Sequence, residues 1–129
     1  MTNFANSLKK TNPSSNSRTS DLAEAVSRES YLYLTTRGRR SGLPREIEIW
    51  FTLQAGRFYV IAEYETSNWL RNIQANPEVQ VRIGSTGFAA HARILSRYND
   101  ATLIAAVADL SRQKYAWGDG VVVELTPQK

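Results

Sequence analysis

The chain has 129 residues, of which 42% are hydrophobic and 22% charged, a size and composition typical of one soluble globular domain. It has no cysteine and a single histidine, which excludes disulfides, iron–sulfur clusters, thiolate zinc sites and a histidine-based metal centre. No apolar run approaches the roughly 18 residues of a membrane span, and the N-terminus has no apolar signal segment, so the sequence predicts a cytoplasmic protein.

The first residues of the chain differ from the rest in composition. Twelve of residues 1–20 are Ser, Thr or Asn, which predicts a flexible tail, because such a segment buries too little apolar area to offset its ordering entropy. Lys9, Lys10 and Arg18 make this tail basic, so at most a weak contact with an anionic membrane surface is expected. The folded domain is expected over residues 21–129.

The hydrophobic pattern of this domain alternates mostly with a period of two, which is typical of half-exposed strands. The pattern predicts a mainly β (α+β) fold, a small antiparallel β-barrel, because strands joined by short turns cannot form a doubly wound parallel sheet and closure removes exposed edges. Its ligand is expected on the outside, at the seam of a homodimer. Strands are predicted at 31–36, 46–53, 57–62, 79–83, 88–95 and 121–125, and short helices at 21–28, 67–76 and 100–113.

A basic turn between the first two predicted strands carries the strongest local signal. Its glycines, Gly38 and Gly42, allow a tight turn that directs backbone N–H groups outward, and Ser41 adds a hydroxyl, so the turn could bind an anion. It could equally be a solvated basic turn. Clustered arginines favour a small anionic ligand over nucleic acid, which needs a broader stripe of charge. The arginines of this turn are Arg37, Arg39, Arg40 and Arg45.

Several aromatic side chains have two possible roles. Trp50 interrupts the alternation of its strand, so it either packs against a partner subunit or lines the site of a flat ligand. Tyr115 and Trp117 lie in a loop, where they either close on a ring-shaped substrate or plug the barrel end. Trp69 is expected to fasten its helix to the barrel, and Asn72 either reaches a ligand or bonds the local backbone.

Residues that could perform catalysis directly are scarce. The segment Gly118-Asp119-Gly120 does not lie between a strand and a helix, so it is not a dinucleotide fingerprint. His91 is expected to face solvent or a partner subunit. We therefore expect no catalytic residue and chemistry carried by a bound cofactor.

Two ordered motifs resemble the deazaflavin-dependent nitroreductase family. Residues 34–45, LTTRGRRSGLPR, are similar to its L-T-T-x-G-R-[KR]-[ST]-G-x-P-R motif, and residues 69–77, WLRNIQANP, to its W-x-x-N-L-x-A-N-P helix. The resemblance covers residues 30–95 well and the last third loosely. It implies the split β-barrel of pyridoxamine-phosphate-oxidase-like (PNPOx-like) flavoproteins, usually dimeric, with the deazaflavin coenzyme F420 or occasionally FMN.

The resemblance also implies roles for individual residues. It implies hydride transfer from the reduced coenzyme to a small acceptor that is aromatic or quinone-like, the alternative being a non-catalytic protein that binds FMN or an apolar ligand. The positional candidates for contact with the substrate are Trp50, Tyr115 and Trp117. Residues implied to hold the phosphate and acidic tail are Arg39, Arg40, Ser41 and Arg45, and those implied to flank the deazaflavin ring are Ala62, Trp69 and Asn72.

One segment departs from the family pattern. Many members have a glycine-containing segment after the third strand, whereas residues 62–66 here are AEYET. Glu63 and Glu65 are therefore expected near the coenzyme, where they would repel an anion unless they point away or pair with Arg37 or Arg71.

Overall fold

The computed structural model describes residue 26 and residues 28–128. The predicted tail and most of the predicted helix at 21–28 lie outside these residues. The two remaining predicted helices and all the predicted strands are confirmed, with one strand divided in two. The elements are β1 (Tyr31–Arg37), β2 (Pro44–Trp50), β3 (Thr52–Gln54), β4 (Arg57–Ala62), α2 (Asn68–Ala75), β5 (Glu78–Ile83), β6 (Thr86–Ile94), α3 (Ala101–Tyr115) and β7 (Val121–Pro127).

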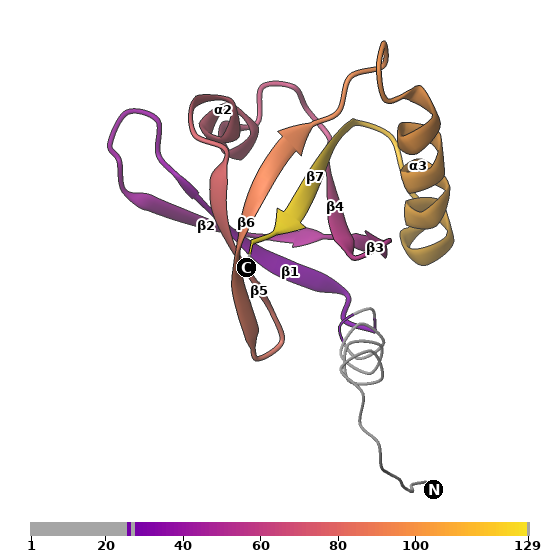
Figure 1. Ribbon diagram of the computed structural model, residues 1–129, viewed down its shortest axis with the longest axis horizontal. Coiled ribbons are helices and arrows are strands. Elements are labelled where there is room, and N and C mark those ends of the chain that lie inside the picture. Colours follow the sequence, from indigo (N-terminus) through magenta and orange to yellow (C-terminus); the bar gives the residue numbers. More distant parts are fainter. Residues whose placement is uncertain (1–25, 27, 129) are drawn as a thin grey trace, which may run out of the picture.

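The strands form one antiparallel sheet in the order β2-β1-β5-β6-β7-β4-β3. Its two edge strands, β2 and β3, are consecutive in the chain and are separated only by Phe51. The sheet must therefore curl until its edges approach, and Figure 1 shows this curl, with β4 running steeply across the direction of β1 and β2. The predicted small antiparallel barrel is confirmed as this curled, split form.

The predicted strand at 46–53 is divided because its two halves have different partners. β2 pairs with β1, for example Leu34 with Ile47, whereas β3 pairs with β4, for example Thr52 with Tyr59. The sequence pattern also predicts that strand 46–53 forms a hairpin with strand 57–62 through a turn at Ala55-Gly56, and this prediction is correct only for β3. The alternation continues through the break, because Phe51 is buried in the same core against which Ile47 packs.

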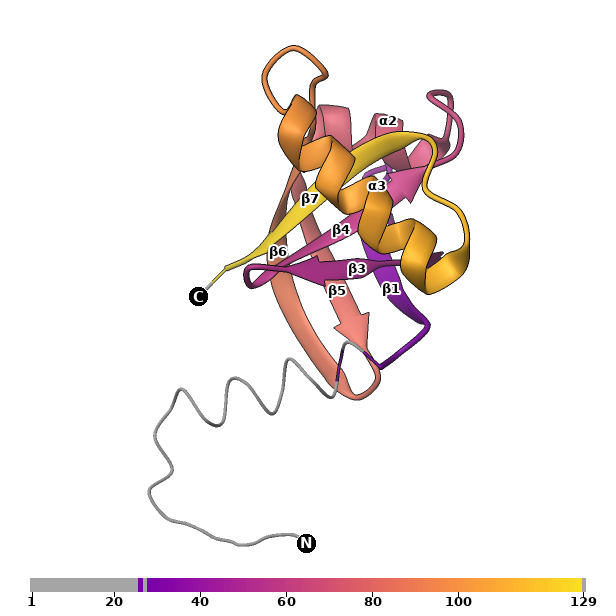
Figure 2. The same ribbon diagram turned by 90° about the vertical axis from the view of Figure 1, so that its right-hand side faces the viewer.

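Two hydrophobic clusters hold the molecule together. The larger fills the curl of the sheet, where every second residue of β1 and β5 is buried, as the period of two predicts. The smaller lies on the other face of β4 and β7, where Tyr59, Ile61 and Val122 pack beneath Val107 of α3. Figure 2 shows α3 lying across these strands. No helix in the described part of the chain has the length and hydropathy to cross a membrane.

The break at Phe51 is stabilised from the end of α3. The hydroxyl of Tyr115 accepts a hydrogen bond from the Phe51 N–H at 3.0 Å and lies 2.8 Å from the Phe51 carbonyl. Lys114 Nζ donates to the same carbonyl at 3.1 Å and lies 3.9 Å from the centre of the Phe51 ring. These contacts satisfy polar groups that would otherwise be left unpaired where the strand is interrupted.

Glu124 ties β7 to its neighbours on the side covered by α3. The carboxylate is buried and accepts hydrogen bonds from Tyr59 at 2.9 Å, Arg93 at 3.2 Å and Arg57 at 3.4 Å. Arg93 also pairs with Asp100 at 3.0 Å, immediately before α3. These hydrogen bonds offset the free energy that the carboxylate loses when burial removes its hydration.

Candidate functional site

The turn between β1 and β2 is closed by its own hydrogen bonds. The Gly38 N–H donates to the Leu43 carbonyl and the Gly42 N–H to the Gly38 carbonyl, each at 2.8 Å. Ser41 Oγ accepts from the Leu43 N–H at 3.1 Å. Gly42 has φ +74°, which favours glycine, and a Cβ on Gly38 would lie 2.6 Å from Ser41 Oγ, so it would disturb the hydrogen bond that this hydroxyl accepts.

Asn72 on α2 fixes the turn from below. Its Oδ1 accepts from the backbone N–H of Arg39 at 3.2 Å and from the Arg39 guanidinium at 2.9 Å, while its Nδ2 donates to Thr36 Oγ1 at 3.1 Å. Arg39 also reaches Asn68 Oδ1 at 3.3 Å. The sequence leaves two roles open for Asn72, contact with a ligand or a bond to the local backbone. Asn72 is buried, and the contacts observed are with the protein backbone and with Arg39.

Several donors of the turn have no partner within the described residues. These are the backbone N–H groups of Arg40 and Ser41 and the guanidinium groups of Arg40 and Arg45. They border a groove of about 290 Å³ between the turn and α2. A shallow groove with unpaired cationic and amide donors is suited to a phosphate or carboxylate. The predicted residues that line it are Arg39, Arg40, Ser41, Arg45, Trp69 and Asn72.

Ala62 is the predicted cofactor residue that lines neither this groove nor the pocket described next. It ends β4 with its side chain buried in the core. A Cβ on Gly120 would collide with the Ala62 carbonyl, so β7 approaches this strand end closely. The residues on either side, Ile61 and Glu63, face the second pocket instead.

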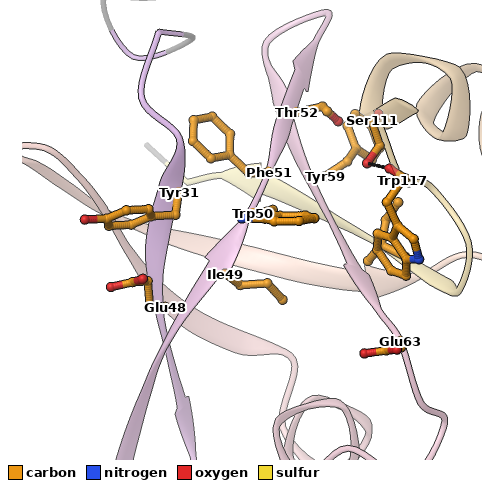
Figure 3. Close-up of a pocket in the computed structure, with 11 residues that line it drawn as sticks. Tyr31, Glu48, Ile49, Trp50, Phe51, Thr52, Tyr59, Glu63, Ser111 and Trp117 are labelled. Atoms are coloured by element: carbon orange, nitrogen blue, oxygen red, sulfur yellow. Dashed lines mark hydrogen bonds between the residues drawn. The ribbon is translucent and has the colours of Figure 1, made fainter. Parts of the chain in front are cut away.

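The second pocket, of about 480 Å³, lies between β2, β4 and the loop after α3. Trp50 and Trp117 line it with ring centroids 6.4 Å apart and planes at 66°. Tyr115 stacks on Trp50 at 4.6 Å without lining the pocket. The structure therefore brings all three substrate candidates together: Trp50 and Trp117 form part of the pocket wall, and Tyr115 supports Trp50 from behind. Figure 3 shows Trp50 and Trp117 on opposite sides of the pocket.

Other lining residues were not predicted from the sequence. Thr52 is buried, and its Oγ1 has no hydrogen-bond partner within the described residues. Ser111 Oγ donates to the Trp117 carbonyl at 2.5 Å and so holds the loop that carries this aromatic wall. Burial and the hydrogen bond to Glu124 raise the pKa of Tyr59 to about 12, so this phenol stays protonated. These residues come from three elements that only the fold assembles.

The groove and the pocket differ in charge. The groove has three arginines and no carboxylate among its lining residues, whereas the pocket has Glu48 and Glu63 and no basic residue. Glu63 and Glu65 make no ion pair in the part of the chain that the structure describes, so the expected alternatives of pairing with Arg37 or Arg71 are not observed. Glu63 borders the pocket and not the arginine groove.

His91 lies away from both cavities. Its side chain on β6 is 49% exposed, as expected, and Nδ1 lies 2.8 Å from Glu78 Oε2. The hydrogen bond to His91 and a second one from Gln128 hold the pKa of the Glu78 carboxyl below its usual range. This pair joins directly opposed positions of β5 and β6 and lines neither cavity.

The two cavities adjoin along β2. Ile47 lines the groove and Ile49 lines the pocket, and both side chains pack toward the barrel core. Residues two apart on one face of a strand are separated by about 7 Å. One elongated ligand could thus place an anionic end in the groove and a flat ring at the mouth of the pocket.

The fold belongs to the PNPOx-like split barrels. A putative pyridoxamine 5'-phosphate oxidase from Listeria innocua is similar with a TM-score of 0.68 at 15% identity, covering 85% of this chain and 93% of that one. The conserved hypothetical protein Rv2991 from Mycobacterium tuberculosis gives 0.70 at 16%, covering 85% and 80%. An F420-H2 dependent reductase, FDR-A, gives 0.53 at 20%, covering 77% and 94%. At these identities the likeness shows the fold alone.

The family follows from the sequence match. The model of the F420H(2)-dependent quinone reductase family matches residues 10–124, so this chain belongs to that family and is an oxidoreductase. The predicted class, an F420-dependent split-barrel reductase, is confirmed. A non-catalytic protein that binds FMN is not favoured by these comparisons.

Proposed function

We propose that this protein transfers a hydride from reduced F420 to a small flat acceptor of the quinone or nitroaromatic type. In this proposal the arginine groove holds the anionic tail of the coenzyme, and the aromatic pocket holds the acceptor. The observation that carries it is the placement of Ile47 and Ile49, which puts a cationic groove and an aromatic pocket side by side on one strand. F420 has the matching division, with an anionic phosphate and tail at one end and a flat ring at the other.

The donors of the groove fit an anionic group. Arg40 and Arg45 have no carboxylate partner among the described residues, so an incoming phosphate displaces no existing ion pair. The Arg40 and Ser41 N–H groups add neutral donors beside these charges. Arg39 is already bonded to Asn72 and Asn68, so its contribution includes holding the turn in shape.

The pocket would orient the acceptor and exclude water from one side of it. When bound, reduced F420 supplies a hydride, which carries two electrons and one proton, and a second proton from solvent completes the reduction of a quinone to a hydroquinone. Trp50 and Trp117 offer the acceptor a face and an edge, the arrangements that aromatic rings prefer. The Ser111 bond to the Trp117 carbonyl keeps this wall in place. The protein thus contributes positioning, and the cofactor carries the chemistry.

The test of the proposal is the affinity for F420 of the variant Arg40→Ala with Arg45→Ala. Each lost charged hydrogen bond costs about 1.5–3 kcal/mol, so we expect the Kd to rise at least tenfold with an unchanged melting temperature. Arg97→Ala removes an exposed arginine outside the groove and is the matched control. Equal affinity of the double variant and this control would overturn the placement of the tail, and tighter binding of FMN than of F420 would overturn the choice of cofactor.

We also propose that the protein is a homodimer. Two large aromatic side chains are exposed at paired positions of β1 and β2, Tyr31 at 40% and Trp50 at 48%. Aromatic side chains of this kind are enriched at interfaces between subunits. Sedimentation equilibrium at micromolar concentration is expected to give twice the chain mass of 14.5 kDa, and a single monomeric species would contradict the proposal.

A further inference from the structure

We infer that Glu63 makes the aromatic pocket selective against acceptors that carry a negative charge. The inference rests on the proposed function, because it names the class of acceptor for the same pocket. It states that an uncharged or cationic flat acceptor is reduced in preference to the same ring carrying a sulfonate or carboxylate.

The position of Glu63 supports this role. It directly follows β4, whose end forms one side of the pocket, and Figure 3 shows its carboxylate directed toward the side where Ile49 and Trp50 lie. Within the described residues no arginine, lysine or histidine lies within 4 Å of it, and none lines the pocket. Its charge therefore acts on whatever enters beside Trp50.

The second carboxylate of the pocket has a different position. Glu48 lies on β2 with Trp50, but Figure 3 shows its carboxylate beside Tyr31, on the far side of the strand from Trp117. Glu48 is paired with Tyr33 in the register of β1 and β2, and the Tyr31 hydroxyl, burial and, to a smaller extent, the Glu48 carboxylate raise the pKa of Tyr33, so this carboxylate already faces a phenol. Glu63 is thus the carboxylate on the side of the pocket that holds the two tryptophans.

The neighbouring groove gives the selectivity a purpose. Its unpaired arginines attract anions, so an anionic acceptor would be drawn to the place assigned to the coenzyme tail. A negative charge at the pocket opposes that competition, because like charges in adjoining sites disfavour the wrong ligand. The two cavities thereby sort two ligands by charge, the anionic one to the groove and the uncharged one to the pocket.

The experiment compares three acceptors that share one naphthoquinone ring: a neutral one, one with a sulfonate and one with a quaternary ammonium group. For the unmodified protein with reduced F420 we expect a higher kcat/KM for the cationic and neutral acceptors than for the sulfonated one. In Glu63→Gln the ratio of the sulfonated to the neutral acceptor should rise about two- to fivefold, the effect of one exposed charge. Glu65→Gln removes the same charge two residues away, outside the pocket, and should leave the ratio unchanged.

Two further measurements separate charge from shape. Raising the salt concentration from about 0.02 M to 0.5 M should raise the same ratio in the unmodified protein and not in Glu63→Gln, because salt screens exposed charges. Quenching of tryptophan fluorescence by each acceptor, without coenzyme, should show the same order of affinity. Equal ratios for the unmodified protein and Glu63→Gln in both assays would overturn the inference.

The outcomes also distinguish this inference from the proposed function. If all three naphthoquinones are reduced equally well, the reductase activity stands and the role of Glu63 fails. If none is reduced although F420 binds, the proposed acceptor class fails, and the fluorescence order still decides whether Glu63 repels anions from the pocket.

Discussion

The rings of Trp50 and Tyr115 stack face to face, with centroids 4.6 Å apart and planes only 3° from parallel. The hydroxyl of the same tyrosine bonds to the backbone of Phe51, the residue at which the strand passes from one edge of the sheet to the other. One side chain thus stabilises both the break in the strand and a wall of the aromatic pocket. The shape of the pocket is therefore coupled to the closure of the barrel.

Replacing Tyr115 by phenylalanine separates these two functions. The ring remains to stack on Trp50, but the Phe51 N–H loses its acceptor, so we expect the free energy of unfolding to fall by about 1–3 kcal/mol. Urea denaturation measures this change. Tyr98→Phe, at a tyrosine that is 97% exposed, is the control and should have no effect. Equal stability of the two variants would mean that the hydroxyl contributes nothing at the break.

The local part of the site was predictable, and the assembled part was not. The basic turn depends on Gly38, Ser41 and Gly42, whose contacts span only a few residues, so its residue types indicate its shape. The break at Phe51 leaves no such trace, because the alternation of apolar residues continues through it. The two halves of the interrupted strand pair with different strands, and the side chain that satisfies the Phe51 backbone there is Tyr115, which is 64 residues away in the sequence.

The same reasoning explains the different outcomes for single residues. The W-x-x-N pattern places Asn72 on a helix near the turn, but its bonds to Arg39 join residues 33 positions apart and follow only from the packing of α2 on β1. The family resemblance also implies that Ala62, at a strand end, flanks the coenzyme ring, whereas its side chain faces the core and Glu63 faces the pocket. Alternation gives the two faces of a strand, and only the fold tells which face has a cavity.

Asn72 is expected to act on cofactor binding through the turn. In Asn72→Ala the Arg39 N–H and guanidinium lose their shared acceptor, and Thr36 Oγ1 loses a donor in a buried place. We expect a loss of about 1–3 kcal/mol in the free energy of unfolding together with weaker F420 binding. Chemical denaturation and titration with F420 measure the two effects. The Arg40→Ala, Arg45→Ala variant, by contrast, is expected to lower the affinity for F420 without lowering stability. If Asn72→Ala also weakened F420 binding without lowering the free energy of unfolding, Asn72 would not act by holding the turn in position.

Alkaline pH is expected to destabilise the protein through Tyr59. Burial, with the hydrogen bond to Glu124, raises the pKa of this phenol from 10.0 to about 12 in the folded state. The folded protein therefore holds the proton more tightly than the unfolded chain, so the contribution is complete below pH 10 and is lost as the pH rises toward 12. The unfolding free energy measured across this range should fall. Tyr59→Phe should be less stable at neutral pH and should show a smaller fall, whereas an identical fall in the variant would assign the effect to other groups.

The last prediction concerns residues 1–20, for which the sequence predicts a flexible tail with at most a weak contact with an anionic membrane surface. All seven strands and every residue placed in the groove or the pocket lie between Tyr31 and Pro127, so deletion of residues 1–20 should leave the melting temperature and the F420 affinity unchanged. Val26 sets the limit of this tolerance, because its side chain is only 8% exposed and belongs to the main core cluster.

A longer deletion, of residues 1–28, removes Val26 and provides the contrast. Burial of one valine side chain stabilises a protein by about 1.5–3 kcal/mol, so this second variant should unfold at a clearly lower temperature. The comparison of the two deletions is informative because the match to the family model begins at residue 10, inside the predicted tail. If deletion of residues 1–20 alone weakens F420 binding tenfold, part of that segment lies over the groove, and the domain begins earlier than residue 21. If both deletions leave stability unchanged, the contact of Val26 with the core contributes nothing measurable.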